Sequence, residues 1–71
     1  MFRLYEIELL TGRVTKTFGK EGHHEKVIAA WMNNDNRLHI GNKLLKNKTI
    51  FNISYSDHPM SREDVEKEMR S

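Results

Sequence analysis

The chain has no cysteine, one proline and no long apolar run. Without cysteine, neither a disulfide framework nor a thiolate zinc site can stabilise the fold. The longest apolar run, Val27 to Met32, is far shorter than the roughly 20 residues that a membrane-spanning helix needs. Charged residues at Arg3 and Glu6 interrupt the N-terminal stretch where a secretory signal would be apolar. We therefore expect a soluble, cytoplasmic protein without a membrane partner.

Small size and a mixed charge limit the protein further. With 71 residues the chain forms one domain, and a domain of this length buries only about 60% of its unfolded surface. Twelve Lys and Arg against ten Asp and Glu leave a net charge of +2, too little to require a nucleic-acid partner. Because only 37% of the residues are hydrophobic, a homodimer that shares a buried face is favoured.

Alternation of apolar and polar residues predicts three strands. Two of them, at 2–10 and 13–19, form a hairpin around a two-residue turn at Thr11-Gly12. The third covers 49–56, and Pro59 prevents its continuation. The core face of this sheet is expected to hold Tyr5, Ile7, Leu9, Val14, Phe18, Phe51, Ile53 and Tyr55.

A single helix is predicted over 23–33. Its apolar stripe consists of Val27, Ile28, Trp31 and Met32, and Asn33-Asn34 suits the helix end because Asn tolerates the left-handed conformation. We expect Trp31, like Phe51, to belong to the core rather than to a ligand site.

Two segments leave alternatives open. Residues 35–48 suit either a short strand pair or a packed loop around Gly41-Asn42. The charged tail at 61–71 starts with a helix-capping pattern at Ser61, and Val65 and Met69 are spaced i, i+4. A docked short helix and a frayed end are both compatible with that tail.

The resulting fold class is α+β. We predict a single ββαβ domain at 1–60, with one helix packed on a three-stranded, mainly antiparallel sheet, followed by the tail at 61–71. The opposite sheet face is close to neutral and carries three apolar side chains that a second copy could cover, Leu4, Leu10 and Ile50.

No residue pattern indicates catalysis, a cofactor or a metal. The adjacent His23 and His24 would point about 100° apart on a helix, and the spacing of the four histidines matches no specific metal motif. Asp57 and His58 are neighbours that face opposite ways at a strand end, so they do not suggest a catalytic triad. We therefore predict that the protein is not an enzyme.

The most distinctive charge feature is a basic segment at 37–48. Arg37, Lys43, Lys46 and Lys48 lie there among several asparagines, which could hydrogen-bond phosphates or bases. The alternative is a solvated loop whose lysine stems cover leucines. No known nucleic-acid reading motif accompanies the segment.

Length and element order resemble the Yopt family of prophage proteins from bacilli. The resemblance lies in the hairpin from Tyr5 to Gly19, the helix from His24 to Asn34 and the strand from Thr49 to Tyr55. It implies one helix, three strands and a homodimer, and it supplies no functional residues. We expect a small, non-enzymatic interaction protein, a phage or prophage accessory factor acting as a homodimer. The alternative is a nucleic-acid-binding regulator that uses the basic segment.

Overall fold

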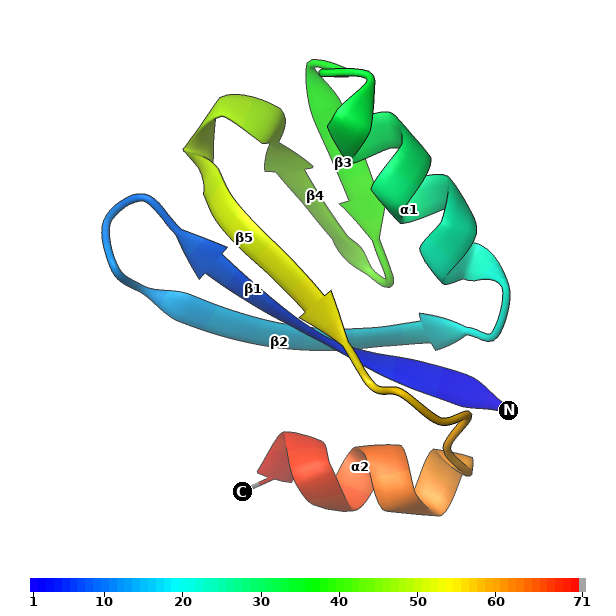
Figure 1. The fold of residues 1–71 in the computed structure, drawn as a ribbon. Helices are drawn as coiled ribbons and strands as arrows, with labels where there is room; N and C mark the ends of the chain where they lie inside the picture. The colour runs from blue at the N-terminus through cyan, green and yellow to red at the C-terminus, as the bar shows by residue number, and fades with distance from the viewer. Residues whose placement is uncertain (71) are drawn as a thin grey trace.

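A computed structural model of the protein describes residues 1–70 of the 71. It confirms the α+β class and contains a three-stranded antiparallel sheet, a separate two-stranded sheet and two α-helices (Figure 1). In chain order the elements are β1 (Phe2–Leu9), β2 (Val14–Lys20), α1 (His23–Met32), β3 (Arg37–Ile40), β4 (Lys43–Lys46), the 3₁₀ helix η1 (Asn47–Thr49), β5 (Ile50–Tyr55) and α2 (Arg62–Arg70).

The larger sheet has the order β2-β1-β5 and separates two packed layers. Helix α1 and the β3–β4 hairpin cover one face, and α2 lies against the other (Figure 1). The main core lies on the first side, where side chains from the sheet, α1 and the hairpin meet. Its buried members are Tyr5, Ile7, Val27, Leu38, Ile40, Ile50 and Ile53.

The turn between β1 and β2 is one residue longer than predicted. Leu9 donates its N–H to the carbonyl oxygen of Arg13 over 2.8 Å, and Gly12 donates to the carbonyl of Leu9 over 2.9 Å. The loop between the paired residues Leu9 and Arg13 therefore has three residues. Gly12 closes it with a φ of 88°, which a residue with a side chain rarely adopts.

This extra residue exchanges the two faces of β2. Val14 lies opposite Glu8 and Phe18 opposite Leu4, so both share the face away from the main core. Our prediction that Val14 and Phe18 face the core is wrong, because a one-residue change of register moves every side chain to the other face. Thr17, only 1% exposed, occupies the core side instead.

A β-bulge in the pairing of β1 with β5 decides which of two neighbouring residues on β5, Ile50 or Phe51, faces the core. Glu8 pairs with Asn52, but Leu9 pairs with Ile50, which leaves Phe51 as the additional residue. Ile50 is therefore buried in the core with 7% of its surface exposed, whereas Phe51 is 61% exposed. The prediction of Phe51 in the core and Ile50 on the opposite face is wrong in both parts.

Residues 37–46 form a hairpin, which decides between the alternatives for the middle of the chain. Leu38 and Ile40 of β3 are buried beneath α1 and the sheet. The turn of the hairpin touches β2, where the Thr17 hydroxyl donates to Oδ1 of Asn42 over 2.7 Å. A Cβ atom at Gly41 would overlap the backbone of Phe18, so only glycine allows this close approach. The predicted ββαβ order lacked this strand pair.

Helix α1 agrees with the sequence pattern. It ends where Asn34 takes a φ of 58°, the left-handed conformation expected there. Val27 is buried, and Trp31 packs against the core as a half-buried side chain. Met32 is predicted to belong to the apolar stripe of this helix, but its side chain is not part of the core, because the residue is 76% exposed.

The tail forms a docked helix over its described part, and Ser71 lies outside the described residues. Asp64 donates its N–H to the Ser61 hydroxyl over 3.1 Å, which is the expected helix cap. Val65 is completely buried, and the Arg62 guanidinium lies 5.9 Å from the centre of the Phe2 ring. Helix α2 thus covers part of the sheet face that the argument for a dimer took to be open.

Candidate functional site

The outer edge of β5 is open in the described residues, because β5 pairs there with β1 alone. Ser56 donates its N–H to the Leu4 carbonyl over 2.9 Å, so the backbone groups of Ser56 point toward β1. In an antiparallel pair this orientation alternates along the strand. The N–H and C=O groups of Ile53 and Tyr55 therefore lie in the plane of the sheet and point away from β1. We call Phe51, Ile53 and Tyr55 the β5 edge.

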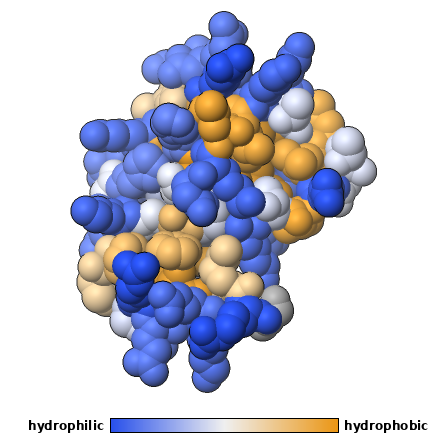
Figure 2. Space-filling view, turned by 180° about the vertical axis from the view of Figure 1, so that it is seen from behind, coloured by the Kyte–Doolittle hydropathy of each residue, from blue (hydrophilic) through white to orange (hydrophobic). Residues whose placement is uncertain are grey.

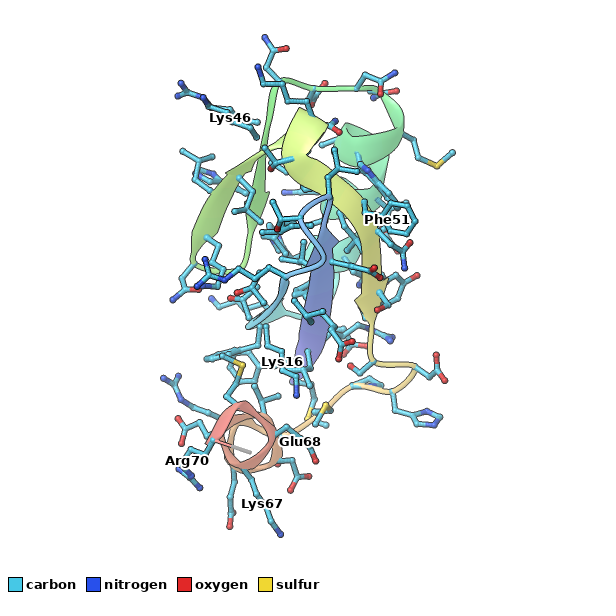
Figure 3. The ribbon with its side chains drawn as sticks, turned by 90° about the vertical axis from the view of Figure 1, so that its left-hand side faces the viewer. Lys16, Lys46, Phe51, Lys67, Glu68 and Arg70 are labelled. Carbon is cyan, nitrogen blue, oxygen red and sulfur yellow. The ribbon has the colours of Figure 1, made fainter. Side chains whose placement is uncertain are left out.

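The β5 edge lacks two of the usual protections against pairing with another chain. Natural edge strands are protected by charges, by proline or by a covering element. The strand Ile50–Tyr55 contains neither a charge nor a proline. Phe51 extends beside β5 on the side away from β1 (Figure 3). Tyr55 is 39% exposed and packs against His24, with 5.1 Å between ring centres.

The three predicted dimer contacts do not form one surface. Leu4 is half-buried on the face that α2 partly covers, and Ile50 belongs to the core. Leu10 is 64% exposed in the turn after β1. Figure 2 shows an apolar area on the upper part of the molecule seen from behind. Other exposed apolar side chains are Val14, the first residue of β2, and Leu44 on β4.

A second surface gathers positive charge. Arg37 on β3 lies directly opposite Lys46 on β4, and both side chains are exposed. Lys48 follows in η1, and we call these three residues the basic hairpin surface. Within residues 1–70, ion pairs join Arg3 to Glu21 and Arg62 to Glu66, and none involves the three cations of this surface. Like charges directly opposite each other destabilise a strand pair.

The basic hairpin surface borders a hollow of about 400 Å³ at the open end of the hairpin. The chain before β3 and the chain after β4 are held together there, because Asn47 donates its N–H to the Asn36 carbonyl over 3.0 Å. Lys43 lies at the turn end of the hairpin, so the structure brings together three of the four predicted cations. The hollow is lined by Asn34, Asp35, Asn36, Arg37, Lys46, Asn47 and Lys48.

The adjacent His23 and His24 make different contacts. Nε2 of His23 lies 3.2 Å from the carbonyl oxygen of His39, whereas the ring of His24 packs on Tyr55. Residues 1–70 contain no group of three or more side chains placed to bind a metal ion.

Burial changes the pKa of one tyrosine, Tyr5. It is completely buried, and this desolvation raises the pKa of its phenol above the ordinary 10.0, an effect that the nearby Arg3 partly opposes. A phenol that keeps its proton far above neutral pH is a core group rather than an acid–base catalyst at neutral pH.

No protein-family model, curated protein or solved structure matches this chain. The resemblance to the Yopt family therefore stays a prediction. None of the helices in the described part of the chain is long and apolar enough to span a membrane.

Proposed function

We propose that this chain is a small, non-enzymatic interaction protein that acts as a homodimer through the β5 edge. The observation that carries the proposal is an uncharged edge strand with backbone groups pointing outward and an exposed phenylalanine beside it. Strand addition supplies main-chain hydrogen bonds, and an aromatic side chain at the edge adds apolar burial. A domain this small also buries a low fraction of its surface, so burial of further surface against a second copy would stabilise it.

The direction of the backbone groups restricts how two copies can pair. We propose an antiparallel pair that joins Ile53 of one copy to Tyr55 of the other, because both residues carry outward N–H and C=O groups and this register uses both of them on each strand. Ser54 then faces its own counterpart in a non-hydrogen-bonded position, where Cα atoms are about 4.5 Å apart. The two-fold axis of such a pair is perpendicular to the continuous sheet and passes between the two β5 strands. The β3–β4 hairpins of both copies therefore lie on the same face of that sheet.

The first experiment is the particle mass by sedimentation equilibrium across a range of micromolar concentrations. We expect the wild type to associate as a dimer and Phe51→Lys to be monomeric, because a lysine charge at the edge opposes pairing. Met32→Lys is the matched control, since it places the same charge at another exposed apolar side chain, and it should remain dimeric. A wild type that stays monomeric at high micromolar concentration, or equal loss in both variants, contradicts the proposal.

A cross-linking experiment tests the register. Because the chain has no cysteine, a single Ser54→Cys substitution gives an unambiguous disulfide across the two-fold axis. The expected Cα separation lies within the range of about 4.4–6.8 Å that a disulfide spans. Asn52→Cys is the control, because two such residues would be offset by about 13 Å along the strands. Covalent dimer from Asn52→Cys but not from Ser54→Cys would refute this pairing.

A further inference from the structure

We infer that the basic hairpin surface binds the phosphodiester backbone of a nucleic acid without reading its sequence. The inference is independent of the proposed dimer, since Arg37, Lys46 and Lys48 lie outside the β5 edge. It rests on three features of the described residues: convergence of three cations, the lack of a neutralising carboxylate in an ion pair with them, and a polar hollow between them.

The cations are held close by the fold at a cost to the hairpin. Strand register places Arg37 and Lys46 opposite each other, and Lys48 follows within the same rim. Opposed like charges destabilise a strand pair. Within the hollow, Asp35 is the single acidic side chain against three cations. A ligand with closely spaced negative charges relieves this repulsion.

The remaining lining favours a phosphodiester over a simple anion. Asn34, Asn36 and Asn47 add amide donors and acceptors around the cations. Side-chain amides contact phosphate and sugar oxygens in nucleic-acid complexes, alongside Arg and Lys. No aromatic side chain lines the hollow, so the stacking on which base-directed single-strand recognition depends is missing. Contact with the backbone is therefore the expected mode.

Salt dependence measures the number of phosphates engaged. For three contacts, raising the salt from 50 to 200 mM should weaken binding roughly 40-fold for duplex DNA and roughly 20-fold for a single strand. The dissociation constant should lie in the non-specific range, about 10⁻⁴ to 10⁻⁶ M. Fluorescence anisotropy of labelled oligonucleotides of about 20 residues, one single-stranded and one duplex, supplies both values.

Matched substitutions separate this surface from net charge. The Lys46→Gln/Lys48→Gln double variant should leave a salt effect of only about fourfold on duplex DNA, because one contact remains. Lys67→Gln/Arg70→Gln removes the same charge from α2, at the other end of the molecule from Lys46 (Figure 3). This control should retain the steep salt dependence. All four side chains are exposed, so neither variant threatens folding.

Three results would overturn the inference. The first is no binding to either oligonucleotide at 50 mM salt. The second is equal weakening by the hairpin variant and the α2 control, which would show attraction by net charge alone. The third is complete displacement of the oligonucleotide by inorganic phosphate at constant ionic strength, which would make the hollow a small-anion site. Retained binding in the presence of phosphate supports the phosphodiester.

Discussion

Replacing Gly41 with alanine tests how the hairpin docks on the sheet. Gly41 has a φ of 61°, and an added Cβ would overlap the backbone of Phe18 and approach the Thr17 hydroxyl oxygen to 2.6 Å. The neighbouring atoms are backbone and a hydrogen-bonded hydroxyl, so they cannot move away without separating the hairpin from β2. The substitution therefore combines backbone strain with a steric clash.

Gly12 supplies the matched control. It also has a positive φ, 88°, but a Cβ there would have no atom within 4 Å. Both alanine variants pay the strain of a left-handed residue, about 1–2 kcal/mol. Gly41→Ala adds the cost of overpacking, typically about 1–3 kcal/mol. We expect Gly41→Ala to lower the free energy of unfolding by about 2–5 kcal/mol and Gly12→Ala by about 1–2 kcal/mol.

Urea unfolding followed by the fluorescence of Trp31, the only tryptophan, measures both changes. The difference is large for a domain of this size, whose total stability is expected near 4–10 kcal/mol. It corresponds to a gap of several degrees in Tm between the two variants, at about 4–8 °C per kcal/mol. Equal destabilisation of the two variants would refute the docking of the hairpin turn on β2.

Further predictions concern α2 and the buried phenol. Val65→Ala should lower stability by about 2 kcal/mol in thermal unfolding through lost burial and a cavity, whereas the exposed Glu63→Ala should change it by less than about 0.5 kcal/mol. Ser61→Ala should cost about 1 kcal/mol in urea unfolding and Ser61→Asp should restore it, because aspartate also caps a helix; equal values would argue against the cap. Burial raises the Tyr5 pKa in the folded state, so stability is complete below the unfolded value near 10.0 and decreases as the pH rises through the folded value. Urea midpoints between pH 8 and 11.5 should therefore decrease less in Tyr5→Phe than in the wild type, and an identical decrease would contradict the shift.

The candidate surfaces illustrate how far local pattern reaches. Counting charges identifies the cations of the basic segment, but only the pairing of β3 with β4 brings Arg37 beside Lys46 and leaves Lys43 at the other end. Likewise the strand at Ile50–Tyr55 is readable from its alternation, while its position at the edge of the sheet is not. Both surfaces depend on contacts between residues distant in sequence, which composition and periodicity do not encode.

Helix α1, the strands β1, β2 and β5, and the cap of α2 follow from properties of short segments: alternation, helical spacing and a serine at the start of a helix. These are interactions within a few residues, so a single sequence is enough to predict them. The errors occur where one residue changes a register. A three-residue turn in place of two moved Val14 and Phe18 away from the core, and one bulge exchanged Ile50 with Phe51. In both cases the period-two alternation was correct, and the packing of the whole sheet against α1, the hairpin and α2 selected the face that each strand buries.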